Sequence, residues 1–363
     1  MATDQFGVYV HVPFCSKRCD YCAFATFTDR HHLAVDYMHA VKTHIERTVA
    51  SGMPKADSMF VGGGTPSMVP AELLAEVIAA IPRSADAEVT VECNPDNITP
   101  KLLRTYVDAG VNRISLGVQS TVPHVLTSLG REHDRANVVR AVEWVRESGV
   151  RSFNLDVIYG GHGESLDDWR TTVEDVVALD PPHVSAYALT VEPGTPLADD
   201  HARHPDDDDQ AGKYELVDDL LVANGLANYE ISNWAKAGHE CRHNRIYWLQ
   251  GDYAAFGSAA HGHHDGMRWW NVRTPDRYIE MINNGEEPVS SSEQLDDDTR
   301  RLEALQLLIR MREGVPSSAF SETDLEELAP FLERRGATVT LTRAGRLMAN
   351  EVSMRLKVDN AFR

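Results

Sequence analysis

Apolar positions along the first half of the chain fall into two alternating kinds of segment. Short runs rich in β-branched and aromatic residues predict strands, and longer segments with apolar residues three and four positions apart predict helices. The predicted strands are Gly7–Phe14, Asp57–Gly62, Glu88–Cys93, Arg113–Val118, Ser152–Tyr159 and His183–Leu189. The predicted helices between them are His32–Ser51, Pro70–Ile81, Thr99–Ala109, Arg135–Ser148 and Asp167–Leu179.

Each strand–helix repeat takes about 25–40 residues, which is the length of a parallel βαβ unit. Six such units in succession predict an α/β fold, either a barrel or a doubly wound sheet. In both architectures, ligands bind at the carboxyl ends of the strands. Glycine and polar residues occur at four of these ends, at Gly62–Gly64, Glu92, Gln119 and Asp156. We therefore expect one ligand site along this rim.

The pattern changes in the second half of the chain. The acidic run Asp206–Asp209 precedes an amphipathic segment, Tyr214–Val222, and is typical of the exposed start of a helix. From residue 290 onward, the predicted elements are helices at Thr299–Arg312, Glu322–Arg335 and Arg343–Leu356 and a strand at Ala337–Leu341. We interpret this region as a small C-terminal α/β domain with a winged-helix-like order. The chain is thus divided into a barrel with the ligand site (1–200), an extension of the barrel (201–289) and the C-terminal domain (290–363).

The net charge and the composition of the chain exclude some classes of binding partner. The 363 residues carry a formal net charge of −20, and the lysines and arginines are scattered along the chain. Such a chain repels phosphate backbones, so we expect no nucleic-acid partner. No apolar run approaches the roughly 20 residues of a membrane span, and the first residues do not resemble a signal peptide. We therefore expect a cytoplasmic protein without a transmembrane segment.

Three of the five cysteines, Cys15, Cys19 and Cys22, follow the first predicted strand within eight residues. An odd number of clustered cysteines does not fit a secreted disulfide framework. Three thiolates from one loop can hold a cuboidal iron–sulfur cluster, which leaves one iron free for another ligand. The alternatives are a structural zinc site completed by a residue such as His11, or three buried thiols without a metal.

The CxxxCxxC spacing at the end of the first strand resembles the signature of the radical S-adenosylmethionine (radical SAM) superfamily. In that superfamily, S-adenosylmethionine binds the free iron, and one electron from the cluster cleaves it to a 5′-deoxyadenosyl radical. Further motifs resemble the branch that contains oxygen-independent coproporphyrinogen III oxidase and the HemW-type haem chaperones. They are YVHVPF from Tyr9, GGGTPS from Gly62, ECNP from Glu92, SLGVQS from Ser115, LGR from Leu129, NLDVIYG from Asn154, YEISNWA from Tyr229 and CRHNRIYW from Cys241.

This resemblance implies a partial (β/α)6 barrel that holds a 4Fe-4S cluster on the three clustered cysteines, with S-adenosylmethionine as cofactor. The cofactor needs acidic partners for its amine and hydroxyl groups and an arginine for its carboxylate. The cofactor-binding residues implied are Tyr9, Tyr21, Gly63, Gly64, Thr65, Glu92, Gln119, Arg131, Asp156 and Ala188.

A second candidate site follows Cys241. His243-Asn-x-x-Tyr247-Trp248 is similar to the HNxxYW motif discussed as haem-binding in HemW-type proteins. Imidazole is a common axial ligand of haem iron, and an aromatic pair suits a flat macrocycle. The resemblance therefore implies haem-binding roles for His243, Tyr247, Trp248 and Cys241. The histidines in His261–His264 are alternative ligands, and both Cys241 and His243 could instead be buried structural residues.

These motifs are compatible with two functions. The favoured one is a haem chaperone that transfers haem to an acceptor protein. The alternative is a radical enzyme that acts on a porphyrinogen, for which an electron donor would be required. Phe24 stands where the oxidase has a further cysteine, and only eight residues precede Tyr9, where the oxidase has a longer segment. Both departures favour the chaperone. Whether the chain is also an enzyme stays open here, as does its assembly as a homodimer.

Overall fold

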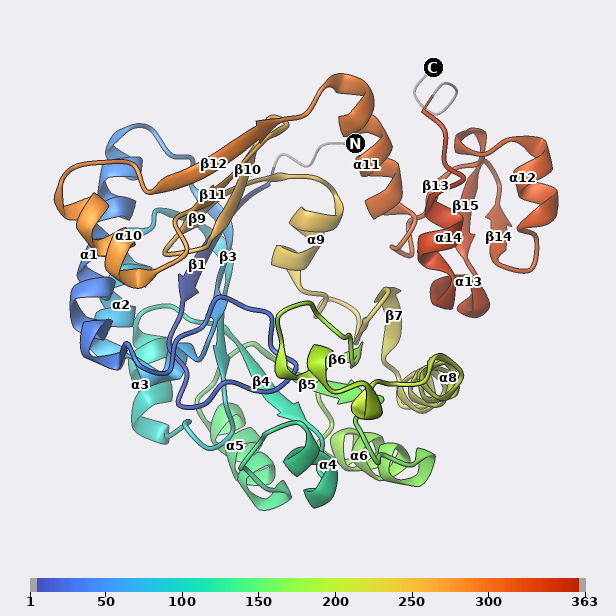
Figure 1. Cartoon of the computed structure of the whole chain (residues 1–363), viewed down its shortest axis with the longest axis horizontal. Coiled ribbons are helices and arrows are strands. Elements are labelled where there is room, and N and C mark those ends of the chain that lie inside the picture. Colours follow the sequence, from blue (N-terminus) through green and yellow to red (C-terminus); the bar gives the residue numbers. More distant parts are fainter. Residues whose placement is uncertain (1–4, 359–363) are drawn as a thin grey trace.

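The computed structural model describes residues 5–358, and its centre is a curved parallel sheet (Figure 1). The six strands that the sequence predicts are present, with boundaries shifted by a few residues. They are β1 (Phe6–Val12), β2 (Ala56–Gly63), β3 (Arg83–Cys93), β4 (Arg113–Gln119), β5 (Ser152–Tyr159) and β6 (His183–Ala188). Neighbours in the chain pair in parallel, and β1 does not pair with β6, so the barrel is open. The expected partial barrel is confirmed.

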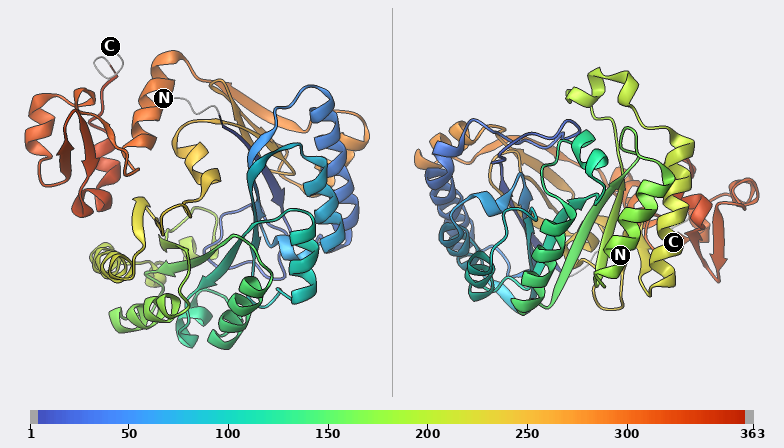
Figure 2. Two further views of the ribbon diagram at one scale, coloured as in Figure 1. Left: turned by 180° about the vertical axis from the view of Figure 1, so that it is seen from behind. Right: turned by 90° about the horizontal axis from the view of Figure 1, so that it is seen from below.

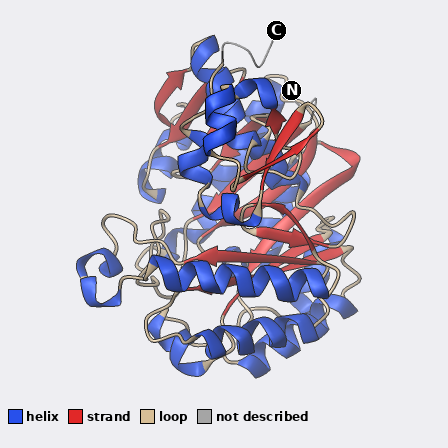
Figure 3. Cartoon of the chain, turned by 90° about the vertical axis from the view of Figure 1, so that its right-hand side faces the viewer, coloured by secondary structure: helices blue, strands red, loops and turns tan. Residues whose placement is uncertain are grey.

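Helices cover the outer face of this sheet (Figures 2 and 3). The predicted ones are α1 (Ala34–Ala50), α2 (Ala71–Ala80), α3 (Pro100–Asp108), α5 (Arg135–Glu147) and α6 (Leu166–Ala178), with α4 (Pro123–Ser128) inserted before α5. Strand residues such as Val8 and Val10 are fully buried beneath them. Local capping fixes where helices start, because Asp134 and Ser165 each form a capping box at the first turn of α5 and α6.

The sheet extends on both sides by strands that the sequence analysis did not predict. Next to β1 lie β9 (Asp252–Phe256), β10 (His261–His264), β11 (Met267–Asn271) and β12 (Val289–Gln294), and beyond β6 lie β8 (Asn233–Ala235) and β7 (Ala227–Glu230). These strands are three to six residues long, and every residue of β12 is exposed. Such strands show no clear alternation of apolar and polar residues, so the sequence pattern does not predict them. Helix α9 (Arg242–Trp248) packs against β1 and β2, and α10 (Pro275–Asn283) packs against α1.

The C-terminal region forms a second, smaller core beside the barrel (Figure 1). Its elements are α11 (Asp297–Leu308), β13 (Val315–Pro316), α12 (Glu322–Glu327), β14 (Leu332–Arg335), β15 (Thr338–Leu341), α13 (Arg343–Leu347) and α14 (Ala349–Ser353). Two predictions were wrong here. The helix predicted over Glu322–Arg335 ends at Glu327, because Pro330 cannot continue a helix, and Leu332–Arg335 pairs with β15 instead. The helix predicted over Arg343–Leu356 is divided into α13 and α14.

The predicted boundary at residue 290 falls inside β12, which pairs with β11, whereas the C-terminal core begins in α11. The division into three regions, and the winged-helix comparison, stay predictions. Within residues 5–358, no helix has the length and apolar character needed to cross a bilayer.

One buried cation ties the longest late helix, α8 (Asp207–Ala223), to the rim of the barrel. The side chain of Lys213 has no exposed surface, and its Nζ lies 2.6 Å from Asp209 Oδ2 and 3.2 Å from Glu164 Oε2. The same ammonium donates to the backbone oxygen of Glu164 at 2.7 Å. Glu164 Oε2 in turn accepts from the Gly160 amide at the end of β5. Lys213 therefore fixes the loop that follows β5.

We predict that Lys213→Met lowers the free energy of unfolding by about 3 kcal/mol, because the buried carboxylate of Glu164 loses its counter-charge. Urea denaturation of the two proteins measures the difference. Lys236→Met is the matched control, since Lys236 pairs with Asp180 at the exposed surface, and we expect it to cost less than about 1 kcal/mol. Equal effects of the two substitutions would contradict this role.

Candidate functional site

The three clustered cysteines lie on a loop that follows β1, which we call the cysteine loop (residues 13–27). Its two ends are joined by a hydrogen bond from the Phe27 amide to the Pro13 oxygen at 2.7 Å. A tight turn brings the Cys22 amide within 3.1 Å of the Cys19 oxygen. The guanidinium of Arg18 donates to the Cys22 oxygen at 3.0 and 3.2 Å. These bonds keep the cysteines on one compact turn.

A second segment holds this loop from the opposite side. Arg203, in the segment after β6, forms a 2.8 Å ion pair with Asp20 and donates to the Ser128 oxygen at 2.7 Å. The Leu197 amide donates to the Asp20 oxygen at 3.0 Å. The position of the cysteines therefore depends on residues that lie far away in the sequence.

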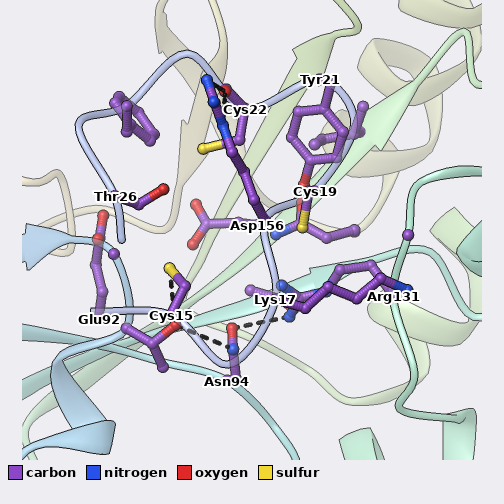
Figure 4. Close-up of a pocket in the computed structure, with 18 of the residues that line it drawn as sticks. Cys15, Lys17, Cys19, Tyr21, Cys22, Thr26, Glu92, Asn94, Arg131 and Asp156 are labelled. Carbon is purple, nitrogen blue, oxygen red and sulfur yellow. Dashed lines mark hydrogen bonds between the residues drawn. The ribbon is translucent and has the colours of Figure 1, made fainter. Parts of the chain in front are cut away.

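Cys15, Cys19 and Cys22 are partly exposed free thiols that line one cavity of about 620 Å³, which we call the outer cavity (Figure 4). The Thr65 hydroxyl donates to Cys15 Sγ at 3.6 Å. Burial raises the pKa of the Cys15 and Cys22 thiols, so that a bound metal would be needed to hold them as thiolates. Among the described residues, no three His, Cys, Asp or Glu side chains lie close enough together to hold one metal ion.

The ends of the barrel strands supply the other walls of the outer cavity. The predicted cofactor residues that line it are Tyr21, Gly63, Gly64, Thr65, Glu92, Gln119, Arg131, Asp156 and Ala188. Tyr9 lies deeper, where it lines an adjoining cavity of about 220 Å³, the inner cavity. Its hydroxyl lies 3.0 Å from His11 Nδ1. The structure therefore brings all of these residues except Tyr9 to the same cavity as the cysteines.

Two glycines at the end of β2 leave no room for side chains. Gly63 has a φ of 109°, and a Cβ there would lie 2.4 Å from the His11 ring. A Cβ on Gly64 would lie 2.7 Å from the Phe14 oxygen. At the end of β4, which β3 separates from β2, Gln119 has a φ of 62° at an irregularity in the strand. Strained backbone of this kind concentrates at ligand sites.

Two acidic side chains face this rim. Burial, with a smaller effect of nearby Asp156, raises the pKa of Glu92 to about 8, although the Gly63 amide donates to its Oε2 at 3.2 Å. Burial also raises the pKa of Asp156, which accepts hydrogen bonds from Ser115 Oγ at 2.8 Å and Asn154 Nδ2 at 2.7 Å. These acids can accept hydrogen bonds from the amine and hydroxyl groups of a ligand.

Arg131 lines the same cavity, as do Lys17 and Arg18 of the cysteine loop. Arg131 Nη2 donates to Asn94 Oδ1 at 2.8 Å and to the Gly117 oxygen at 3.1 Å, which orients its guanidinium (Figure 4). The sequence analysis did not select Asn94 as a site residue, although it lies inside the ECNP motif next to Glu92. The outer cavity thus combines three thiols with two acids, an oriented arginine and a turn without side chains. This set of groups fits an iron–sulfur cluster together with S-adenosylmethionine.

The predicted haem residues lie elsewhere, in and just before α9. His243 is fully buried, and its ring nitrogens lie 2.8 Å from Ser58 Oγ and 2.7 Å from Tyr247 Oη. Cys241 is buried with its thiol 3.6 Å from Glu88 Oε1. Cys241, His243 and Tyr247 line the inner cavity, whereas Trp248 does not. An iron ion could reach His243 only if the imidazole gave up one of its hydrogen bonds.

We predict that the contribution of Glu92 to the stability of the ligand-free protein falls as the pH rises from about 5 to about 8, by about 1 kcal/mol per unit at the steepest part. In this range the unfolded chain releases the proton of Glu92, whereas the folded chain, with its raised pKa of about 8, retains it. Above pH 8 both states are ionised and this effect ends. Urea denaturation across the pH range measures it.

Glu92→Gln keeps the neutral shape and should remove this pH-dependent term. Glu286→Gln, at an exposed loop, is the control and should leave the wild-type profile unchanged. A Glu92→Gln profile identical to that of the wild type would show that Glu92 is not protonated in the folded state.

Comparisons with known proteins agree with this geometry. Residues 9–176 match the family model described as Radical SAM superfamily. The chain is 40% identical to the heme chaperone HemW of Mycobacterium tuberculosis, over 97% of this chain and 95% of the relative. It is 32% identical to the heme chaperone HemW of Bacillus subtilis, over 95% and 97% of the two chains.

Among solved structures, coproporphyrinogen III oxidase (HemN) from Escherichia coli, described as a radical SAM enzyme, superposes with a TM-score of 0.84 at 21% identity, covering 96% of this chain and 89% of that one. This likeness confirms the fold. From the full-length similarity to the curated relatives, the chain belongs to the HemW family of haem chaperones within the radical SAM superfamily.

Proposed function

We propose that the protein is a haem chaperone that binds haem and transfers it to an acceptor protein, and that it carries a 4Fe-4S cluster on Cys15, Cys19 and Cys22. One observation carries the cluster assignment: three free thiols on one turn line a cavity that also receives the ends of the barrel strands. A bound cluster would supply an open iron site and a one-electron reductant.

Residues of the outer cavity would hold an exchangeable S-adenosylmethionine. Arg131 has the charge and orientation to bind its carboxylate, and Glu92 and Asp156 can accept hydrogen bonds from its amine and ribose. Gly63 and Gly64 allow its methionyl end to approach the backbone of β2. In a chaperone, this cofactor would act as a regulatory or structural ligand.

Haem would bind beside α9, with Cys241, His243, Tyr247 and Trp248 as the proposed residues. Three of these line the inner cavity, which adjoins the cluster site. The further partners that we propose are the haem acceptor and, if radical chemistry occurs, an electron donor. We propose that the protein acts in the cytoplasm, and a second copy of the chain is a candidate partner in a homodimer.

We predict that Cys19→Ala abolishes the iron–sulfur cluster, because two thiolates cannot hold a cuboidal cluster that normally uses at least three. Iron and sulfide analysis after anaerobic reconstitution, together with the visible absorption spectrum, measures the loss. Cys241→Ala is the control, since this buried thiol lies outside the outer cavity, and it should retain the cluster. Wild-type protein that bound zinc tightly and no sulfide would end the cluster assignment.

We predict that the reconstituted protein binds haem in about equimolar amount and does not consume coproporphyrinogen III in the presence of S-adenosylmethionine and a reductant. Haem titration followed by absorption spectroscopy and chromatography of the porphyrinogen measure the two outcomes on one preparation. His243→Ala should weaken haem binding without changing the cluster spectrum.

His39→Ala is the matched control for that substitution, because His39 is exposed on α1 and is not among the proposed or alternative haem ligands. Consumption of coproporphyrinogen III with release of 5′-deoxyadenosine would replace the chaperone assignment with the radical enzyme. Unchanged haem affinity in His243→Ala would move the iron ligand to another residue.

A further inference from the structure

The inner cavity lies inside the barrel, toward the amino ends of the strands. It adjoins the outer cavity, because the two share a set of lining residues. The shared residues are Phe24, Gly63, Glu92, Ser115, Asp156 and Tyr187. Its volume of about 220 Å³ is below the ~300 Å³ at which ordinary small-molecule sites begin. A whole macrocycle does not fit, but an arm of a ligand that lies outside can enter.

Arg113, the first residue of β4, faces this cavity and is only 3% exposed. Its side chain forms no hydrogen bond and no ion pair with any residue between 5 and 358, and its buried Nε has no partner. A guanidinium stays charged in proteins and offers five N–H donors. A buried charge without an acceptor is costly, so this group requires an explanation.

The acidic groups near Arg113 are already engaged with other donors. Glu88 Oε1 accepts from the Cys241 thiol at 3.6 Å and from the His243 amide at 3.2 Å. Asp156 accepts the two side-chain hydrogen bonds described above. Both carboxylates act on Arg113 at a distance, but neither accepts a hydrogen bond from it. The N–H groups of Nη1 and Nη2 therefore remain available for a ligand, whereas Nε is buried.

The histidines of the inner cavity do not compete as cations. His183 Nδ1 lies 2.7 Å from Asn154 Oδ1, and its Nε2 lies 2.8 Å from Tyr229 Oη. Burial, followed by the charge of Arg113, lowers the pKa of His183 well below its ordinary value and that of His243 to about 3. At neutral pH, Arg113 is therefore the cationic group that lines this cavity.

We propose that the inner cavity is a carboxylate site, in which Arg113 binds a propionate arm of the tetrapyrrole while the ring stays outside. A planar guanidinium binds a carboxylate through two parallel hydrogen bonds, which matches the donors left unused here. Three of the proposed haem residues, Cys241, His243 and Tyr247, line the same cavity. With the ring outside, they would contact the propionate arm, and iron coordination by His243 would require the cavity to open. This inference rests on the proposed function, and it assigns a specific group of the ligand to a specific residue.

Haem titrations of the wild type and of Arg113→Gln test the assignment. Loss of hydrogen bonds to a charged group predicts an affinity reduced about tenfold to a hundredfold. Haem dimethyl ester, whose propionates carry no charge, should bind the wild type more weakly than haem does and should bind both proteins equally. Arg151→Gln is the matched control, because Arg151 is exposed directly before β5, and it should bind both ligands as the wild type does.

The remaining outcomes of these titrations overturn the proposal. An equal loss of affinity for haem and for its dimethyl ester in Arg113→Gln would show a merely structural role. Unchanged haem affinity would exclude contact with a propionate. A reduced affinity for S-adenosylmethionine, with haem binding intact, would identify the cofactor carboxylate as the partner of Arg113.

A second experiment does not depend on haem binding. Sodium propionate should raise the midpoint of thermal unfolding of the wild type above that in sodium chloride of equal ionic strength, and it should have no such effect on Arg113→Gln.

If the wild type did not bind haem, the chaperone assignment would fail, while the propionate experiment would still decide whether a carboxylate site exists. Equal shifts by propionate in both proteins would overturn the site.

Discussion

The site depends on the need to hold three thiols on one short loop in a fixed position. A loop of this length has no core of its own, so a few hydrogen bonds and ion pairs fix its geometry. The bond between Phe27 and Pro13 closes its base, and the ion pair between Asp20 and Arg203 ties it to a segment outside the loop. Parallel strands bring all their carboxyl ends to one rim. The loop after β1 therefore lies beside the ends of β2 to β6, where the acids, the arginine and the glycines are found.

The two faces of the barrel sheet are packed differently, with apolar side chains on the outer face and polar side chains on the inner face. Alternate residues of each strand point outward, where apolar side chains such as Val8 and Val10 pack beneath helices, or inward, where polar ones meet. The inward side chains of β5, Asn154 and Asp156, take part in a hydrogen-bonded network with Ser115. Such a network stabilises the interior only when its members are satisfied. Arg113 lies beside this network, and among residues 5–358 it has no hydrogen-bond acceptor.

The sequence predicts the central fold well, because long strand–helix repeats carry a strong periodic signal and because strand ends locate the rim. The sequence does not predict strands β7 to β12, because these short strands show no alternation of apolar and polar residues. It also predicts one helix over Glu322–Arg335, whereas the helix ends before Pro330 and the following residues form a strand. Of the ten cofactor residues that the sequence predicts, the structure brings nine to one cavity. The Asp20–Arg203 contact could not be predicted, because 183 residues separate its partners.

Burial explains why the haem motif is the least predictable part of the site. From the sequence, His243 is an imidazole next to aromatic residues; in the structure, it connects Ser58 of β2 to Tyr247 of α9 and fills the open barrel from within. The same helix thus packs the interior and carries the motif proposed to bind haem. If His243 is the iron ligand of the proposed haem site, its imidazole would have to give up one of these two hydrogen bonds to bind the metal.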